Sequence, residues 1–473
     1  MSASAASLDV EKAAVSLSAN TSALSVSTTL PRKELPPLRF SARYKPKVTR
    51  AVSFRLWFNT YRKLFAFVLT FNVVGLILAI TGTWQYPRVY TGAFVLGNLQ
   101  VAVLVRNEFF GRLLYLLVNT LFAKWTPLRF RLACTSTLQH LGGIHSGCAV
   151  SGTLWLLFRL VRITANTDRY PASIIVSGLI TFFTLAASFP WIRNSRHNIF
   201  EAGHRLIGWL SLISSKVFVV LGDCYDVSTR SWRAAHIGAS FLVRQQDFWF
   251  AVVMSLLIVM PWVTLRKVPV VVEVPSPKVA IIRFQRGMQQ GLLTRISRGS
   301  WLEFHAFGII SEGRNSGEHF LICGVQGDFT QSLVDHPPTY LWTRQLKCAN
   351  LSNTTKLYKR GIRVCTGTGL GAALSTCLQS PDWHLIWMGS NQEATFGTTI
   401  SSLIRDKLPP EQYTLWDSKV KGGRPVVMRL IRETYEKWGA EVVFITSNMQ
   451  GNAEMMEGCM REGIPAFGTL WDF

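Results

Sequence analysis

Long apolar runs separated by short polar segments dominate the first half of the chain. The first run covers residues 64–83 and is long enough to cross about 30 Å of hydrocarbon as a helix. Five more runs lie at about 89–105, 132–158, 171–190, 200–222 and 248–265. A weaker stretch at 109–123 is interrupted by Arg112 and is interpreted as interfacial. The pattern predicts an α-helical membrane bundle of about six spans over residues 64–266.

From residue 267 the apolar residues alternate with polar residues and prolines, which is typical of short strands. Residues 359–473 instead alternate strand-like apolar runs with helix-like segments, which predicts a parallel sheet with crossover helices. We therefore expect a multi-domain protein in which the bundle precedes a β-rich domain, residues 267–358, and an α/β domain, residues 359–473.

The residues before the first run predict a flexible, basic arm over 1–63. Residues 1 to about 30 are mainly Ser, Ala and Thr and predict a disordered segment. Residues 31–63 carry ten Lys and Arg, and prolines there prevent a long helix. Such a segment favours an anionic cytoplasmic leaflet, and the distribution of basic residues between the runs places both termini in the cytoplasm. We expect an integral protein of the plasma membrane or an endomembrane.

The composition agrees with a membrane protein and favours lipid over nucleic acid as its binding partner. Charged residues make up 16% of the chain, against about 25% in ordinary soluble domains. The net charge of +23 first suggests nucleic acid, but the basic residues are scattered between the apolar runs, so we expect the lipid bilayer and no nucleic acid as partner. The eight cysteines form no CxxC motif, which argues against a disulfide scaffold or a structural zinc site.

A glycine-rich turn within residues 361–375 is the strongest local signal for chemistry. A buried strand is expected to precede it and a helix to follow it, so that backbone N–H groups and the helix N-terminus face one point. Such a turn binds a diphosphate. The residues expected to do so are Thr366, Gly367, Thr368, Gly369 and Gly371. The alternative is that the glycines serve packing alone.

The segments after this turn extend the pattern. Residues 383–390 read as a second strand ending at Ser390, and a later strand ends at Ser447 and Asn448. Together they resemble the NAD(P)H-binding half of the ferredoxin reductase superfamily, in particular its ferric reductase branch. The resemblance implies NADPH or NADH on the turn, with Ser447 beside the nicotinamide in place of the family's Cys-Gly. Arg405 and Arg424 are candidates for recognising a 2′-phosphate. Phe473 would stack on a flavin, with Trp471 as the alternative.

Upstream, residues 302–311 resemble the family's flavin motif. His305, Phe307 and Ser311 keep its spacing, while Ala306 and Gly308 replace the family's Pro and Thr. The resemblance implies that residues 267–358 form a β-barrel that binds FAD, with the FAD diphosphate received at the turn containing Gly327. The alternative is a barrel that has lost its flavin, because fold does not guarantee function.

Histidines in the apolar runs are the remaining candidates. The family holds two haems with histidine pairs spaced about four turns apart along two helices. His140 and His145 are only five residues apart, which is about 500° of helix rotation, so they do not lie on the same helix face. We expect His140 and His204 to ligate one b-type haem, with hydrogen bonding inside the bundle as the alternative.

The overall resemblance is to fungal ferric-reductase-like transmembrane proteins of the TmpA type and to the C-terminal region of some adenylate-forming, peptide-synthetase-like proteins. It implies a membrane-bound oxidoreductase that passes electrons from NAD(P)H through FAD to a haem or a lipophilic small-molecule acceptor, with Ser447 and Phe473 at the reacting rings. Two other classes stay open: a catalytically degenerate reductase fold with a signalling or scaffold role, and a transporter.

Overall fold

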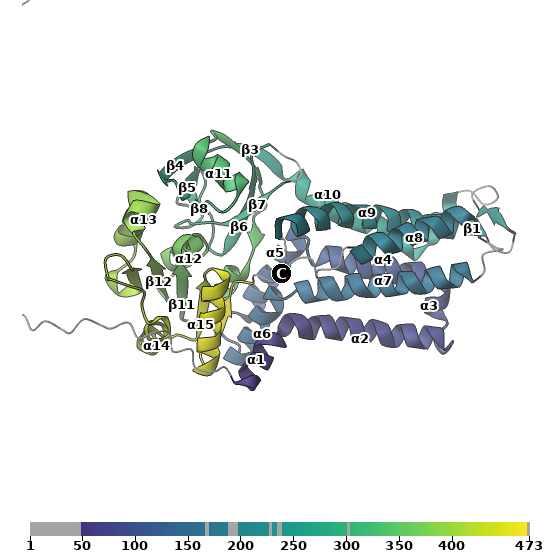
Figure 1. Cartoon of the computed structure of the whole chain (residues 1–473), viewed down its shortest axis with the longest axis horizontal. Coiled ribbons are helices and arrows are strands. Elements are labelled where there is room, and N and C mark those ends of the chain that lie inside the picture. The colour runs from purple at the N-terminus through teal and green to yellow at the C-terminus, as the bar shows by residue number, and fades with distance from the viewer. Residues whose placement is uncertain are drawn as a thin grey trace, which may run out of the picture. The chain divides into compact units, whose positions relative to one another are not determined.

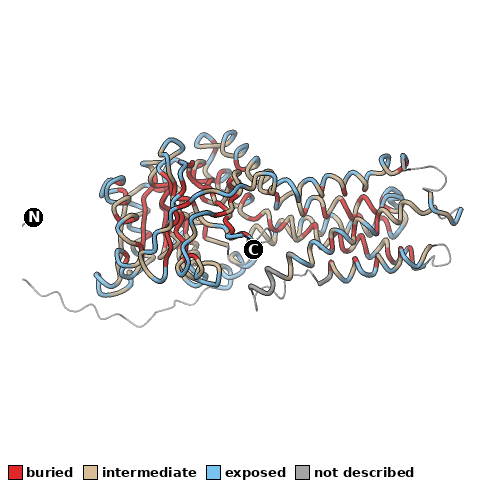
Figure 2. The backbone as a smooth tube through the Cα atoms, turned by 90° about the horizontal axis from the view of Figure 1, so that it is seen from above, coloured by how far each residue is buried: buried red, intermediate tan, exposed pale blue. Residues whose placement is uncertain are grey.

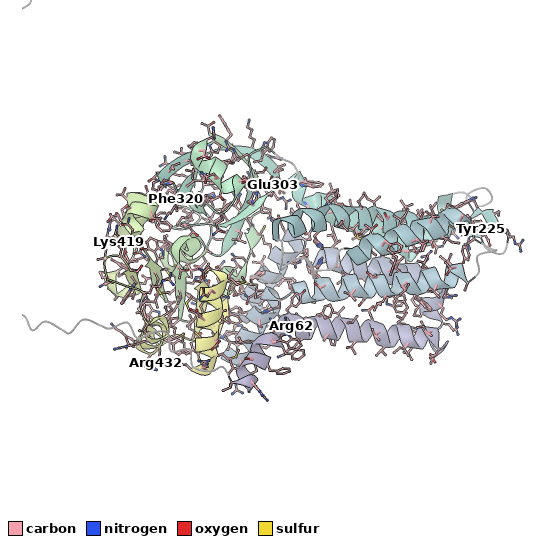
Figure 3. All side chains as sticks on the ribbon, viewed as in Figure 1. Arg62, Tyr225, Glu303, Phe320, Lys419 and Arg432 are labelled. Atoms are coloured by element: carbon pink, nitrogen blue, oxygen red, sulfur yellow. The ribbon has the colours of Figure 1, made fainter. Side chains whose placement is uncertain are left out.

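The computed structural model describes residues 49–165, 170–187, 197–226, 229–233, 239–299 and 303–470. The predicted disordered segment, most of the basic arm and Phe473 lie outside these residues. The part of the arm that is described forms a short helix, α1 (Arg50–Trp57). In Figure 3, Arg62 lies just beyond it, and its guanidinium stacks over the Trp57 ring, 4.8 Å from the ring centroid.

Helices make up most of the chain up to Val263 (Figure 1). After α1 they are α2 (Thr60–Ile80), α3 (Tyr86–Val89), α4 (Thr91–Leu104), α5 (Glu108–Phe122), α6 (Leu128–Gln139), α7 (Gly142–Thr164), α8 (Ala172–Ala187), α9 (His197–Cys224), the 3-10 helix η4 (Ala239–Arg244) and α10 (Gln246–Val263). A two-stranded hairpin, β1 (Tyr225–Asp226) and β2 (Ser231–Trp232), follows α9. The α7 helix packs against α2, α4 and α8 and buries Trp155 and Leu156.

The expectation of six spans is not supported. Within the described residues, four helical segments are long and apolar enough to cross a membrane: α2, α7, Leu206–Cys224 of α9, and α10. The apolar helices over the second and fourth runs, α4 and Ala172–Leu185 of α8, are shorter. The second run, 89–105, is longer than α4 because it includes Val89 of α3 and the residues Tyr90 and Val105, which lie outside that helix.

The third apolar run is divided between two helices. α6 ends before His140, whose backbone angles of φ −106° and ψ 19° leave the helical region, and α7 begins at Gly142. Gly142 and Gly143 lie against Tyr61 of α2, where a Cβ at Gly143 would collide with the Tyr61 carbonyl. The glycines thus permit a close helix contact, and hydropathy alone does not reveal the break.

The β-rich region contains two antiparallel sheets. Its elements are β3 (Leu265–Pro269), β4 (Val271–Ser276), β5 (Val279–Phe284), β6 (Leu292–Ser297), β7 (His305–Gly308), β8 (His319–Gly324), α11 (Asp328–Asp335), β9 (Tyr340–Arg344), β10 (Cys348–Ala349) and the 3-10 helix η5 (Leu351–Leu357). One sheet has the order β10-β6-β9-β3 with β7 also paired to β6, and the other has the order β4-β5-β8. In the described residues the strands do not close into the predicted barrel. Ile282, Ile296 and Leu321 belong to the core between the sheets.

The last region is a five-stranded parallel sheet covered by helices on both faces. Its elements are β11 (Gly361–Thr366), η6 (Gly367–Gly369), α12 (Leu370–Gln379), β12 (Trp383–Gly389), α13 (Gln392–Lys407), η7 (Pro410–Gln412), β13 (Tyr413–Asp417), α14 (Val427–Trp438), β14 (Val442–Thr446), α15 (Met449–Arg461) and β15 (Ala466–Gly468). The strand order is β13-β12-β11-β14-β15. Cys365, Trp387 and Phe444 pack in the core formed with α12 and α13. Val364, Ile386 and Ile445 pack in the core formed with α14 and α15.

Burial explains why these strands read as nearly continuous apolar runs. Helices cover both faces of this parallel sheet, so consecutive residues of a strand can all be buried, whereas a sheet with one solvated face would bury only every second residue. Figure 2 shows buried residues concentrated along these strands. The predicted α/β architecture is therefore observed here.

Ion pairs join the helices to the two sheet regions. Arg131 of α6 forms a two-pronged pair with Glu441, with N–O distances of 2.7 and 2.9 Å. Glu108, the first residue of α5, lies 2.7 Å from Arg295 of β6 and also pairs with Arg344 of β9. The predicted interfacial stretch, α5, thus carries a buried polar contact to the antiparallel sheet.

Candidate functional site

The carboxyl ends of β11 and β14 meet at the point where the strand order reverses. The second and third strands extend the sheet on one side of β11, and the fourth and fifth extend it on the other. Open α/β sheets bind ligands at this position. Thr366, at the end of β11, and Ser447, directly after β14, lie here with their hydroxyl oxygens 2.8 Å apart. Two residues that were predicted as separate parts of one site are therefore neighbours.

Glycine is required at two positions of the glycine-rich turn, at one because of its backbone conformation and at the other because of close packing. Gly367 has φ +51°, in the left-handed region, and a Cβ there would meet nothing within 4 Å, so this residue borders open space. Gly369 lies against β14, where a Cβ would be 2.5 Å from the Thr446 carbonyl oxygen. The packing interpretation therefore accounts for Gly369 but not for Gly367.

Trp387 fixes the turn and was missed in the sequence. Its indole Nε1 donates a hydrogen bond to the Gly367 carbonyl oxygen at 3.0 Å, and the ring is fully buried on β12. A buried indole needs such an acceptor. The signal was a tryptophan near the end of a predicted buried strand, but its partner follows only from the pairing of β11 with β12.

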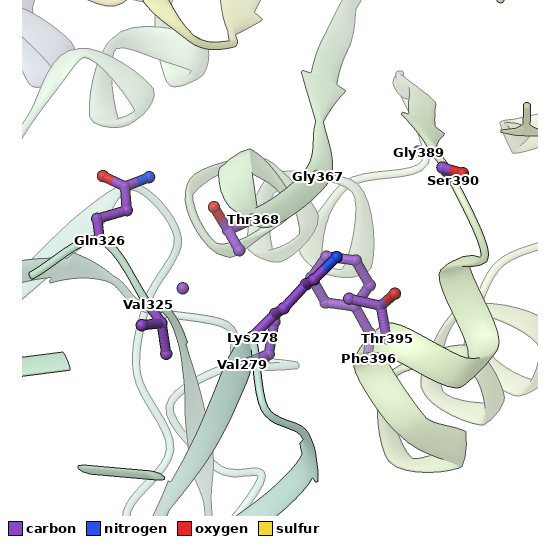
Figure 4. Close-up of a pocket in the computed structure, with 11 residues that line it drawn as sticks. Lys278, Val279, Val325, Gln326, Gly367, Thr368, Gly389, Ser390, Thr395 and Phe396 are labelled. Atoms are coloured by element: carbon purple, nitrogen blue, oxygen red, sulfur yellow. The ribbon is translucent and has the colours of Figure 1, made fainter. Parts of the chain in front are cut away.

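A pocket of about 250 Å³ opens beside this turn (Figure 4). It unites three predicted residues, Gly367, Thr368 and Ser390, with residues of the antiparallel region. The full lining is Lys278, Val279, Gly324, Val325, Gln326, Gly367, Thr368, Gly389, Ser390, Thr395 and Phe396. Pockets that bury a whole small ligand usually enclose about 300–1,000 Å³, so this one accommodates part of a dinucleotide.

The loop after β12 is organised by Asp417, another residue that sequence reasoning missed. Its carboxylate accepts the backbone N–H groups of Asn391 at 2.9 Å and Gln392 at 2.7 Å, at the start of α13. Burial alone would raise the pKa of Asp417, but these N–H groups and those of Lys419 and Val420 hold it below the usual range. The carboxylate of Asp417 therefore stabilises the loop between β12 and α13 by accepting its backbone N–H groups. Arg424 is exposed in the segment between β13 and α14 and does not line the pocket.

The predicted flavin residues lie on and beside β7. The His305 ring stacks on Phe329 of α11 with centroids 4.0 Å apart, and its Nε2 lies 2.7 Å from a carboxylate oxygen of Glu303. Phe307 stacks more loosely on the same ring, at 6.5 Å. Gly327 precedes α11, and its N–H donates to the Thr330 hydroxyl at 3.2 Å.

Two residues of the flavin motif, Gly308 and Ser311, are engaged in contacts within the protein. The buried Ser311 hydroxyl accepts the Met288 N–H at 2.9 Å and also contacts the Gly313 backbone. At Gly308 a Cβ would lie 2.6 Å from the Gly371 carbonyl oxygen, so a threonine has no room. What remains for a flavin is the edge of β7, which among the described strands pairs only with β6, and the rings of His305 and Phe307. These groups fit the flat ring system but supply no hydroxyl contact.

The histidines of the helical bundle are arranged differently from the prediction. The Nδ1 atom of His140 lies 2.7 Å from the carbonyl oxygen of Ser136, in the last turn of the preceding helix α6. His204 instead approaches His145, with ring centroids 6.4 Å apart and the planes at 79°. His145 Nδ1 also lies 2.9 Å from the Ala102 carbonyl oxygen. The pair that the fold brings together is therefore His145 and His204, and haem binding stays a prediction.

Comparison with known proteins supports a reductase relationship for the C-terminal part. Residues 351–473 match the family described as "Adenylate-forming reductase 03009, C-terminal domain". Adenylate-forming reductase 06235 of Coprinopsis cinerea is 29% identical over 88% of this chain, and adenylate-forming reductase 03009 of the same fungus is 28% identical over 88%. The chain spans about 40% of the length of each.

Solved structures give weaker likenesses. A flavohemoglobin from Malassezia yamatoensis with bound FAD and heme aligns over 80% of this chain and 98% of its own, with 13% identity and a TM-score of 0.38. Phthalate dioxygenase reductase aligns over 43% of this chain and 67% of its own, with 12% identity and a TM-score of 0.35. Both scores are too low to support a conclusion about this chain.

Proposed function

We propose that this chain is an oxidoreductase module that binds NADPH or NADH at the reversal point of the parallel sheet. The observation that carries the proposal is the pair of hydroxyls, Thr366 and Ser447, 2.8 Å apart beside a turn whose Gly367 has positive φ and borders open space. The adjoining pocket gives the rest of a nucleotide a place to lie. The match of residues 351–473 to a reductase C-terminal domain supports the same reading.

Different residues of the site would bind the diphosphate, the ribose and the nicotinamide of the nucleotide. Backbone N–H groups at the start of α12 and the Thr368 hydroxyl would bind the diphosphate, because a helix N-terminus favours negative charge. Ser390, at the end of β12, would contact the ribose on the adenine side, where this fold places it. Thr366 and Ser447 would orient the nicotinamide ring, and the buried Trp387 would keep the turn in place.

A flavin would lie along β7, held by the rings of His305 and Phe307. Bound there, FAD would supply hydride acceptance and one-electron release, chemistry that belongs to the cofactor. The chain's own part is to present an edge strand and an aromatic surface and to keep water away from the ring. The Ser311 hydroxyl would take no part, because the Met288 N–H and the Gly313 backbone engage it.

We further propose that the helical region anchors the module in a lipid bilayer. Four helical segments of sufficient length and apolarity support membrane association. His145 and His204 would be the residues to hold a haem, which would supply one-electron chemistry, and the alternative acceptor is a lipophilic small molecule that enters from the bilayer. The two fungal relatives are named as reductases, which is compatible with a small-molecule acceptor.

Nucleotide binding by the purified chain in detergent tests the proposal. Wild-type protein should bind ADP-ribose in calorimetry and should oxidise NADPH or NADH. Ser390→Glu places a negative charge on an exposed pocket residue and should weaken binding, while Thr398→Glu, exposed on α13 outside the pocket, is the matched control. Absence of binding by the wild type, or equal binding by Ser390→Glu, would refute the assigned site.

A second candidate function is a degenerate reductase fold with a signalling or scaffold role. The internal use of Ser311 and the lack of room at Gly308 favour it. Under this alternative the purified protein binds nucleotide but shows no flavin absorption and no NAD(P)H oxidation. Flavin that copurifies and is bleached by NADPH would exclude it.

A further inference from the structure

The tip of the β4–β5 hairpin is attached to α13 of the α/β domain. The Ser276 hydroxyl donates to the Thr395 carbonyl oxygen at 2.9 Å, and a Glu273 carboxylate oxygen accepts from the Thr399 hydroxyl at 2.7 Å. Between these bonds α13 is kinked at Gly397, which has φ +73°, and a Cβ there would lie 2.9 Å from Pro275. The hairpin is therefore held beside the candidate nucleotide pocket by two hydrogen bonds, with Pro275 close to the kink at Gly397.

This attachment delivers Lys278 to the pocket. The Lys278 carbonyl oxygen accepts the Val325 N–H at 2.9 Å, which fixes its backbone on the pocket wall. In Figure 4 its side chain extends from the strand toward Phe396 and the space between Thr368 and Ser390. Of the described residues that line the pocket, Lys278 alone carries a formal charge at neutral pH.

The charge pattern of the pocket suits an anion. Its other polar side chains are the hydroxyls of Thr368, Ser390 and Thr395 and the amide of Gln326, and no carboxylate lines it within the described part of the chain. Two carboxylates on the neighbouring segments are already engaged: Asp417 accepts backbone N–H groups, and Glu273 accepts the Thr399 hydroxyl. Hydroxyls, backbone N–H groups and one ammonium group are the donors that bind phosphate, with lysine acting as a mobile point charge.

We propose that Lys278 binds a phosphate group of the nucleotide and that the site is therefore completed by the antiparallel region. This inference rests on the proposed function and deepens it. The turn would donate its N–H groups from one side of the phosphate, and the ammonium group would approach from the other. A nucleotide would then bind well only while the hairpin stays attached to α13, and nucleosides, which lack phosphate, would gain nothing from Lys278.

Binding of non-redox probes to the full chain in detergent tests this assignment. Adenosine, ADP and 2′,5′-ADP are titrated into the wild type, Lys278→Gln, Lys278→Arg and the control Lys267→Gln. Lys267 is an exposed lysine on β3 of the same region, over the Tyr340 ring and outside the pocket. We expect Lys278→Gln to weaken ADP or 2′,5′-ADP about tenfold, which is 1.4 kcal/mol. Adenosine binding should not change, Lys278→Arg should restore most of the loss, and Lys267→Gln should behave as the wild type.

The probes separate the possible outcomes. A loss confined to 2′,5′-ADP assigns Lys278 to the 2′-phosphate, and a loss confined to ADP assigns it to the diphosphate. A larger salt dependence in the wild type than in Lys278→Gln supports a direct charge contact. Unchanged binding of both phosphates by a folded Lys278→Gln overturns the assignment while leaving the nucleotide site intact. Failure of the wild type to bind any probe overturns both proposals.

Discussion

The ion pair between Arg131 and Glu441 gives a quantitative test of how the helices are joined to the α/β domain. Arg131 is almost fully buried, and its guanidinium also donates to the carbonyl oxygens of Thr126 and Leu357, each at 3.0 Å. Glu441 accepts the Lys359 N–H at 2.8 Å in addition to both arginine contacts. Removing one partner of a buried pair costs about 3–5 kcal/mol, because the other charge is left buried. Since Arg131 keeps two carbonyl partners, we expect Glu441→Ala to cost about 3 kcal/mol, at the lower end of that range.

Hydrogen exchange in detergent measures this cost locally. A loss of about 3 kcal/mol should accelerate exchange in α6 and at the start of β14 on the order of 100-fold, at tenfold per 1.4 kcal/mol. Glu433→Ala is the control, because Glu433 pairs with Arg429 on an exposed face of α14 and should change exchange by less than about threefold. A change in Glu441→Ala no larger than in the control would refute the reasoning.

The same pair predicts an acid sensitivity. Burial alone would raise the pKa of Glu441, but its bonds with Arg131 and the Lys359 N–H hold it below the usual range. The folded state therefore binds the proton less tightly than the unfolded state does. The stabilisation is fully present above the ordinary glutamate pKa and is lost as the pH falls through the lowered value. Exchange in the wild type should approach that of Glu441→Ala only in this acidic range.

Three further predictions concern single residues. Gly308→Ala should lower stability by about 1–3 kcal/mol in thermal unfolding, because its Cβ would lie 2.6 Å from the Gly371 carbonyl oxygen, whereas Gly299→Ala meets no neighbour and should be neutral. Trp387→Phe removes the 3.0 Å bond to Gly367 and should cost about 0.5–1.5 kcal/mol and weaken ADP-ribose binding measured by calorimetry; unchanged affinity would contradict its role in fixing the turn. Burial lowers the pKa of His319 to about 4, so the folded state holds fewer protons than the unfolded state between about pH 4 and 6.5. Stability should rise with pH across that window, and His319→Phe, which preserves stacking on Phe284, should flatten the rise in pH-dependent melting.

The sequence could anticipate that Thr366 and Ser447 of the candidate nucleotide site lie close together. Thr366 and Ser447 each follow a short apolar run, and parallel strands bring their carboxyl ends to one edge, so their proximity follows from the pattern. Ser390 was predictable for the same reason. Lys278 and Asp417 were not, because each reaches the site through contacts between segments distant in sequence.

Predictions for the helical and flavin regions were less successful for identifiable reasons. Hydropathy treats 132–158 as one run, yet the chain leaves the helix at His140 and resumes at Gly142 where α2 approaches closely. That break accompanies the pairing of His204 with His145 instead of His140. Motif spacing selected His305, Phe307 and Ser311 but gave no information on whether the Ser311 hydroxyl was already engaged by the Met288 N–H.

The strand order also has a consequence for biosynthesis. β11 is the central strand, with β12 on one side and β14 on the other, but β14 is translated only after β12, α13, β13 and α14. A nascent chain that stops short of β14 therefore exposes one edge of β11, a largely apolar strand, as a template for association with other chains. Premature termination within that interval should yield insoluble product rather than a smaller folded domain, and chaperone engagement during synthesis should peak there.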